Sequence, residues 1–350
     1  MRSELTPILQ CPACSGERPL TLDVVRRDAL ETREGTLRCP ACGAAYTVER
    51  GIAMLLHEPF RNVLEEAAGL ERFAARMREQ GWDGERIKQL PDVDLDYWWV
   101  QGRSMIQLEE LIDFQPGERL LDVGSNTCWA SARFAGLGLD VVALDISTTD
   151  LQGLDTARYF LDEGIYFERV LASMRELPFA AGQFDYVFCC QVLHHNDRRE
   201  LRRTFAEIYR VLRPGGRLLM VNETLRTLRS PGPASVPEDV VEFEGNEHSH
   251  WALGYRREAR RAGFATETLD PWYRPFFFDP DVVPRGGSMP LLGPLLRRAV
   301  RRSRDIAVVR GAYRAWLNNV WGGVSMNMIA TKPSHQESTG APSGPAPARR

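Results

Sequence analysis

Four cysteines near the start of the chain form two identical Cys-Pro-Ala-Cys motifs, Cys11 to Cys14 and Cys39 to Cys42, with 24 residues between them. A Cys-x-x-Cys turn aims two thiolates at one point, and two such turns supply the four sulfurs of a tetrahedral structural Zn²⁺ site. The alternatives are free thiols in a reducing compartment, or a redox role for one pair. We favour zinc because a repeated pair is a more specific signal than a single one.

A second chemical signal is the stretch LLDVGSNTCWAS, from Leu120 to Ser131, in which a buried strand runs into a tight loop and a helix. A nicotinamide-binding loop needs Gly-x-Gly-x-x-Gly so that a helix N-terminus can approach a pyrophosphate. Here only Gly124 is present, and Asn126 and Cys128 follow at alternate positions. Asn readily takes a left-handed backbone and Cys is small. The loop therefore favours a nucleotide-like cofactor without phosphates over a dinucleotide.

Candidates for proton transfer lie just past the ends of predicted strands. His194 and His195 follow one strand, Glu223 ends the next, and His248 and His250 lie in the segment EGNEHSHW. Each has a structural alternative: a histidine that packs beside a cofactor, a strand-end acid that only holds the backbone, or a solvated loop residue.

The elements that would position these residues alternate between short apolar runs and helical patterns. Continuous apolar strands alternating with helices predict an α/β fold, a doubly wound parallel sheet covered on both faces. Ligands in such sheets bind beyond the carboxyl ends of the strands. The expected strands span residues 119–124, 140–146, 184–191 and 216–223.

The chain divides into several predicted parts. Residues 1–57 form a small zinc-ribbon-like β domain, and the charged, amphipathic residues 58–112 form a helical connector. Residues 113–332 form the main domain, with an insert at about 271–319. The tail, 333–350, is rich in Pro, Ser and Gly and is expected to be disordered.

The insert contains a predicted amphipathic helix with five arginines between Arg297 and Arg304 on one face. Leu292, Leu295, Leu296, Ala299 and Val300 line the other face. This pattern fits an anionic acceptor such as a phosphorylated or lipid-linked molecule, a membrane surface, or RNA. A solvated helix face is the alternative.

The composition of the chain disfavours membrane-spanning and disulfide-rich secreted proteins. A net charge of -3 over 350 residues leaves no global field for nucleic acid or membrane, so any such binding is local. No apolar run approaches a membrane span, which predicts a cytoplasmic protein with at most peripheral membrane contact. Seven cysteines, an odd count, argue against a secreted disulfide framework. The oligomeric state stays open.

Four ordered motifs over about Gly117 to Thr331 resemble the class I S-adenosylmethionine-dependent methyltransferases, whose sheet is Rossmann-like and seven-stranded. They are LLDVG, VVALDIS, ASMRELPFAAGQFDYVFCCQVLHH and VLRPGGRLLMVNE. The resemblance implies that Asp145 receives both ribose hydroxyls of S-adenosyl-L-methionine. The departures are Asn126 and Cys128 in the glycine loop, and Ser173 in place of an acid that contacts adenine. The implied cofactor-binding residues are Asp122, Gly124, Ser125, Asn126, Cys128, Asp145, Ile146, Ser173, Met174 and Gln191.

The segment LRCPACGAAYTVERGIAMLL, Leu37 to Leu56, is similar to the small zinc-ribbon protein that activates several tRNA and translation-factor methyltransferases. The similarity covers about residues 5–57 and implies a domain that stabilises the methyltransferase fused to it.

The class I resemblance implies methyl transfer, and with the arginine-rich insert we expect a small-molecule or lipid- or sugar-linked acceptor. The tentative catalytic residues are His195, His194, Glu223 and His250. The alternatives are an RNA methyltransferase and a non-catalytic protein that binds S-adenosylmethionine or regulates a partner. A nicotinamide dehydrogenase is disfavoured because the phosphate-binding glycines are absent.

Overall fold

The structure is a computed structural model that describes residues 1–14, 16, 18–57, 61–93, 96–228, 248–269, 307–321 and 325–334. The predicted arginine-rich helix and the tail beyond residue 334 lie outside the described residues, as does most of the insert.

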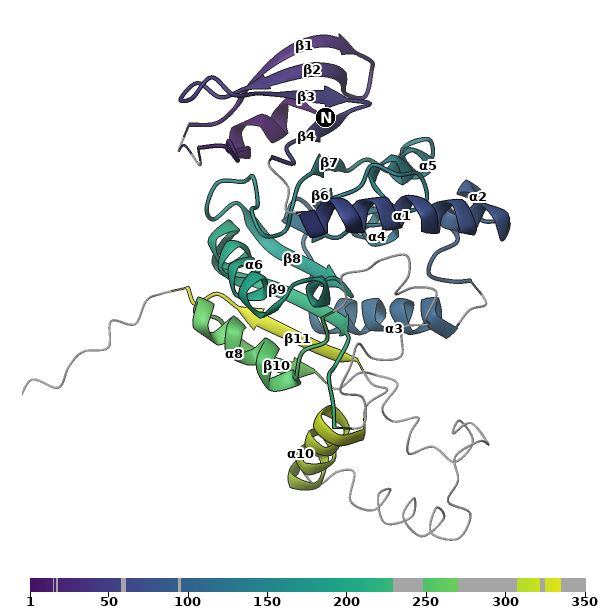
Figure 1. Ribbon diagram of the computed structural model, residues 1–350, viewed down its shortest axis with the longest axis vertical. Coiled ribbons are helices and arrows are strands. Elements are labelled where there is room, and N and C mark those ends of the chain that lie inside the picture. Colours follow the sequence, from purple (N-terminus) through teal and green to yellow (C-terminus); the bar gives the residue numbers. More distant parts are fainter. Residues whose placement is uncertain are drawn as a thin grey trace, which may run out of the picture.

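The described strands form one mixed sheet with the order β1-β2-β3-β4-β7-β6-β5-β8-β9-β11-β10. Figure 1 shows it running from the N-terminal strands at the top to β10 and β11 at the bottom. The strands are β1 Thr21–Arg27, β2 Thr32–Arg38, β3 Ala45–Glu49, β4 Ile52–Met54, β5 Arg119–Val123, β6 Asp140–Asp145, β7 Glu168–Leu171, β8 Phe184–Cys190, β9 Leu212–Glu223, β10 Ala265–Leu269 and β11 Met326–Thr331.

Seven strands, β5 to β11, make up the predicted α/β sheet. β7, β6, β5, β8 and β9 pair in parallel, and β11 is antiparallel to both β9 and β10. The parallel strands are apolar on both faces because both faces are covered. Alternate residues along β5 enter two different cores: Leu120 lies in one, and Leu121 and Val123 lie in the other.

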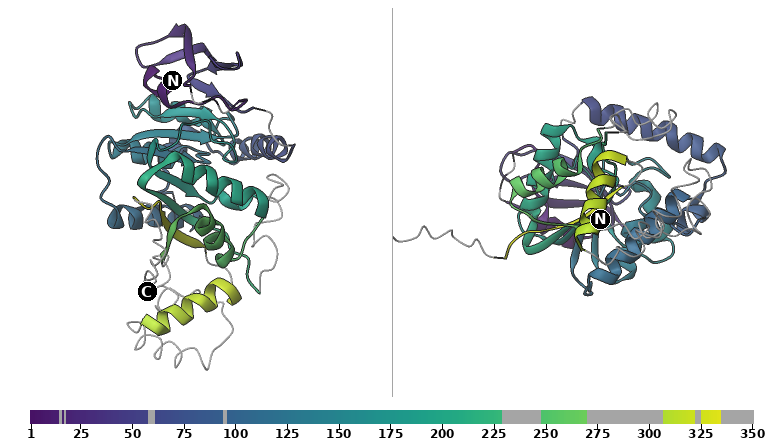
Figure 2. Two further views of the ribbon diagram at one scale, coloured as in Figure 1. Left: turned by 90° about the vertical axis from the view of Figure 1, so that its left-hand side faces the viewer. Right: turned by 90° about the horizontal axis from the view of Figure 1, so that it is seen from below.

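Helices cover the two faces unequally. Side chains of α1, α3, α4 and α5 enter the core that contains Leu120, whereas those of α6 and α8 enter the core that contains Leu121. Two of these helices come from the predicted connector, and α3 is fixed by Trp98, whose ring lies 6.3 Å from that of Trp129. Figure 2 gives two further views of this arrangement. The helices are α1 Arg61–Glu79, α2 Gly84–Lys88, α3 Asp96–Leu111, α4 Trp129–Gly136, α5 Arg158–Leu161, α6 Arg198–Val211, α8 Ala252–Ala262 and α10 Ala307–Trp316.

The N-terminal β region continues the main sheet. β4 pairs in parallel with β7, with Ala53 opposite Val170. Strands β1 to β4 are antiparallel to one another, so the parallel pairing of β4 with β7 is the join between the two parts.

A buried charge cluster lies beside this join. The carboxylate of Glu31, which is fully buried, accepts hydrogen bonds from Arg169 of β7 and from the amino group of Met1. Arg33 also pairs with it, at 2.8 Å. An isolated buried charge is costly, so these partners hold the two parts together in one arrangement.

None of the helices in the described part of the chain is long and apolar enough to cross a membrane.

We predict that Arg169→Ala lowers the free energy of unfolding by about 3 kcal/mol, because it removes the partner of a buried carboxylate. Arg50→Ala is the matched control. Arg50 also reaches across the join, to Asp155, but its side chain is 59% exposed, so its loss should cost less than about 1 kcal/mol. Urea unfolding at fixed zinc concentration measures both, and equal losses would contradict the prediction.

Candidate functional site

The loop between β5 and α4 has a left-handed backbone at three alternate positions. Gly124 has φ 72°, Asn126 has φ 44° and Cys128 has φ 57°. A Cβ atom on Gly124 would lie 2.3 Å from Cγ2 of Val192, so this position requires glycine for space as well as conformation. The non-glycine residues Asn126 and Cys128 keep the bend that a glycine would give.

The loop folds around the carboxylate of Asp145, at the end of β6. One carboxylate oxygen accepts the backbone amide of Asn126 at 2.8 Å, and the other accepts that of Ser147 at 3.0 Å. Burial raises the pKa of Asp145 to about 6, although these amides oppose the shift. The Asp145 carboxylate is therefore a buried hydrogen-bond acceptor at the carboxyl edge of the sheet, beside the loop.

Asp122 lies on the neighbouring strand β5, two residues before Gly124. Its carboxylate accepts the hydroxyl of Ser131 at 2.5 Å, and burial raises its pKa to about 7. The side-chain amide of Asn126 donates to Gln152 at 2.8 Å, which fixes the outer side of the loop.

A histidine and a glutamate form a buried pair at the ends of β8 and β9. Glu223 accepts the backbone amides of Val192 and Leu193, each at 2.8 Å, and lies 3.1 Å from Nδ1 of His194. Burial alone would raise the pKa of Glu223, but His194 and the two amides hold it below its usual value. Glu223 thus fixes the orientation of the His194 ring.

His195 lies against His194, with ring centroids 4.4 Å apart. Its Nδ1 is 3.5 Å from a carboxylate oxygen of Glu66 on α1. Glu66 is buried, and its charge contributes to the raised pKa of Asp145. Helix α1 therefore contributes a buried carboxylate that lies beside His195 and is near enough to Asp145 to affect its pKa. Glu66 was not predicted, since its place on an amphipathic helix does not distinguish it from exposed acids nearby.

The third histidine candidate, His250, plays a different part. Its Nε2 lies 2.8 Å from the backbone oxygen of Asn196, and burial lowers its pKa. It joins the segment before α8 to the segment before α6.

An amide network lies beside the histidines. Gln101 of α3 donates to Gln191 at 2.6 Å and accepts from Asn222 at 3.3 Å. Ser104 of α3 donates to the same Asn222 at 2.7 Å. Gln191 has φ 49° and Asn222 has φ 56°. Strained residues of this kind cluster at functional sites. Of this network only Gln191 was predicted, because the others depend on how α3 packs.

The remaining predicted cofactor residues lie at the same edge. Ser125 is buried in the loop, and Ile146 follows Asp145. The hydroxyl of Ser173 accepts the amide of Arg175 at 3.2 Å, and the sulfur of Met174 accepts from Asn196 at 3.1 Å.

The four predicted zinc ligands converge in the N-terminal part. The sulfur atoms of Cys11, Cys14, Cys39 and Cys42 all lie within 4.8 Å of one another. Those of Cys11 and Cys42 are 3.7 Å apart, as are those of Cys14 and Cys39.

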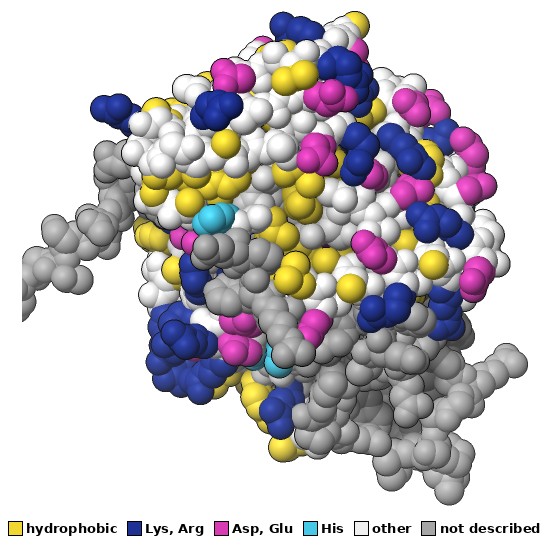
Figure 3. Space-filling model, turned by 45° about the horizontal axis from the view of Figure 1, so that its top comes forward, with side chains coloured by type: hydrophobic (Ala, Val, Ile, Leu, Met, Phe, Trp, Pro, Cys, Tyr) yellow, Lys and Arg dark blue, Asp and Glu magenta, His cyan; other side chains and the backbone are white. Residues whose placement is uncertain are grey.

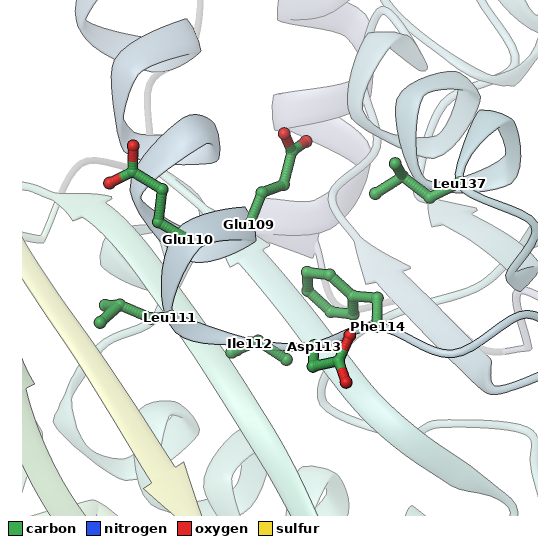
Figure 4. Close-up of a pocket in the computed structure, with 7 residues that line it drawn as sticks. All are labelled: Glu109, Glu110, Leu111, Ile112, Asp113, Phe114 and Leu137. Carbon is green, nitrogen blue, oxygen red and sulfur yellow. The ribbon is translucent and has the colours of Figure 1, made fainter.

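A hollow of about 500 Å³ lies elsewhere, where the chain turns from α3 toward β5 (Figure 4). It includes Glu109, Glu110 and Asp113 and none of the predicted site residues. Most of its lining residues come just before β5 in the chain, so the hollow lies at the amino edge of the sheet, opposite the candidate site.

Comparison with known proteins classifies both parts. Residues 121–220 match the family described as "Methyltransferase domain", and residues 2–51 match "Trm112p-like protein". The chain joins a Trm112p-like domain to a class I methyltransferase domain.

Curated relatives match only the central part of the methyltransferase domain. "Biotin biosynthesis bifunctional protein BioHC" of Cellvibrio japonicus is 36% identical over 31% of this chain and 21% of its own length. "Demethylmenaquinone methyltransferase" of Renibacterium salmoninarum is 36% identical over 30% of this chain and 41% of its own. The chain thus spans less than half the length of these relatives.

Solved structures are similar at lower identity. The "[4+2]-Cyclase SpnF" is 19% identical, with a TM-score of 0.47 over 80% of this chain and 99% of that one. The complex of the Haloferax volcanii "Trm112 methyltransferase activator" and a "putative methyltransferase" is 17% identical, with a TM-score of 0.44 over 75% of this chain and 97% of that one.

We predict that Gly124→Ala lowers the free energy of unfolding of the methyltransferase domain by about 3 kcal/mol, because a left-handed backbone cost adds to the clash with Val192. Gly164→Ala is the control: Gly164 has φ 81° but its Cβ would meet nothing within 4 Å. It should lose only about 1 kcal/mol. Denaturant unfolding curves measure the free energy of unfolding of both variants. The prediction is wrong if the two variants are equally stable.

Proposed function

We propose that this protein transfers a methyl group from S-adenosyl-L-methionine to a small-molecule or lipid- or sugar-linked acceptor. The observation that carries the proposal is the buried carboxylate of Asp145, held beside a left-handed loop at the carboxyl end of a central parallel strand. Ligands of doubly wound folds bind at this position.

The residues present fit the proposed cofactor. The two oxygens of Asp145 have lone pairs beyond those used by Asn126 and Ser147, and a carboxylate can accept two ribose hydroxyls. The loop lacks the glycines that a pyrophosphate needs, and S-adenosylmethionine carries no phosphate. We assign the rest of the site to the neighbouring predicted residues, Asp122, Gly124, Ser125, Asn126, Cys128, Ile146, Ser173, Met174 and Gln191.

When bound, the cofactor supplies a methyl group activated by a sulfonium charge. The protein has to align the acceptor and, for some acceptors, remove a proton. We assign proton removal to His194, because Glu223 orients its ring and stabilises the imidazolium form. His195 lies against His194, and Glu66 lies beside His195. His250 is a positioning residue, since its ring binds the backbone at Asn196.

We also propose that Cys11, Cys14, Cys39 and Cys42 hold one structural Zn²⁺ ion. With Zn–S bonds of about 2.3 Å, the edges of a tetrahedron of sulfurs are about 3.8 Å. The two 3.7 Å sulfur separations match that edge.

Asp145→Ala is expected to weaken binding of S-adenosylhomocysteine by about 2 kcal/mol, roughly thirtyfold, because two hydroxyls lose a charged acceptor. Isothermal titration calorimetry measures this. Asp140→Ala is the matched control, since Asp140 is exposed at the opposite end of the same strand. An unchanged affinity in Asp145→Ala would remove Asp145 from the site, and no binding to the parent protein would contradict the proposed function itself.

Metal analysis by mass spectrometry should find one zinc per chain, because so small a β region with this cysteine cluster draws folding energy from the metal. Cys39→Ser combined with Cys42→Ser should lose the zinc. Cys190→Ser, which removes a thiol in the methyltransferase domain, should keep it. Full zinc content in the double variant would show that the metal lies elsewhere.

A further inference from the structure

The exposed charges of α6 and α8 are all of one sign. We call these residues the arginine face: Arg198, Arg199, Arg202, Arg203, Arg257, Arg260 and Arg261. Every exposed charged side chain within these two helices belongs to it. The acids of the two helices are buried or half-buried, and the most buried of them, Glu258, pairs with Arg202 at 3.0 Å and with Arg261 at 2.8 Å.

Large apolar side chains are exposed at the end of this face where both helices begin. Trp251, just before α8, is 36% exposed, Leu253 is 65% exposed and Leu228 is 68% exposed. We call these three residues the apolar rim. Exposed apolar residues that cluster, unlike scattered ones, mark an interaction surface.

Hydrogen bonds hold the apolar rim beside the arginine face. His250, next to Trp251, contacts Asn196 just before α6. Arg226 donates to the backbone oxygen of the same His250 at 2.9 Å, which brings the segment that carries Leu228 alongside. The backbone amide of Leu228 in turn donates to the backbone oxygen of Asn319, in the π-helical segment Leu317–Trp321 that follows α10.

Figure 3 shows dark blue side chains gathered at the lower left of the molecule, with a few magenta acidic side chains beside them and yellow hydrophobic side chains beneath them. The overall net charge is -3, so this basic surface is a local concentration.

We propose that the arginine face and the apolar rim together bind the surface of an anionic phospholipid bilayer. Arginines near a bilayer surface attract acidic headgroups. Trp and Leu side chains beside them enter the boundary between headgroups and acyl chains. This combination of cationic and apolar groups is the complement of an anionic membrane surface.

RNA is the other polyanion that arginines attract, and it fits the apolar rim less well. Bases stack on aromatic or guanidinium groups, but exposed aliphatic side chains such as Leu228 and Leu253 offer them no stacking face. A bilayer uses aliphatic and aromatic side chains alike.

The surface adjoins the proposed active site. The backbone amide of His248 donates to the backbone oxygen of His194 at 2.8 Å, two residues from His250 and three from Trp251. A bilayer docked on the apolar rim therefore lies next to the carboxyl edge of the sheet, where a lipid-linked acceptor can enter without leaving the membrane.

Sedimentation with vesicles tests the proposal on the full chain without cofactor or acceptor. The parent should bind vesicles of phosphatidylcholine with phosphatidylglycerol, and should bind phosphatidylcholine alone weakly. Arg199→Glu with Arg257→Glu should lower the partition coefficient for the anionic vesicles at least about tenfold. Trp251→Ser with Leu253→Ser should lower it by a similar factor. Neither pair includes an arginine that pairs with Glu258, so the fold should be kept.

Matched controls come from the Trm112p-like domain. Arg18→Glu with Arg27→Glu makes the same change in net charge on exposed residues, and Val24→Ser with Val25→Ser removes exposed apolar side chains from β1. Both should bind like the parent. Three results would overturn the proposal: no binding of the parent to anionic vesicles at low salt, equal loss in the control variants, or binding of single-stranded RNA that depends on Arg199 and Arg257 while vesicle binding does not.

Discussion

The hydrogen bond between the backbone amide of Asn126 and the carboxylate of Asp145 is the interaction on which the candidate site depends. It requires the loop after β5 to turn back over β6, and the loop does so with left-handed backbone at Gly124, Asn126 and Cys128. Left-handed backbone costs about 1 kcal/mol or more at a residue other than glycine. This cost arises at Asn126 and at Cys128. The two amide hydrogen bonds to the buried Asp145 carboxylate offset it.

The Trm112p-like domain is connected to the candidate site by strand pairing in the sheet. Its strand β4 covers what would otherwise be the open edge of β7, and β7 leads directly to Ser173 and Met174. The buried Glu31 and Arg169 fix the same join from the side. A fused domain in this position supports the edge strand of the methyltransferase domain continuously, because it cannot dissociate.

The sequence predicted those features that repeat locally. The apolar runs predicted four of the five parallel strands, β5, β6, β8 and β9, and their ends placed Asp145, His194 and Glu223 at one edge of the sheet. The paired Cys-Pro-Ala-Cys motifs predicted the cysteine cluster. The pairing of β4 with β7 was not predictable, because β4 has only three residues and its partner lies more than a hundred residues away. Glu66 and Gln101 were missed for a related reason: which face of a connector helix is buried depends on tertiary packing.

The central claim is that S-adenosylmethionine occupies the carboxyl edge of β5 and β6. A crystal structure of the protein with S-adenosylhomocysteine tests it most directly. We predict that both ribose hydroxyls will lie within hydrogen-bond distance of the Asp145 carboxylate, with the sulfur atom directed toward His194. A ligand bound away from this edge, for example in the hollow beside Glu109 and Asp113, would contradict the account.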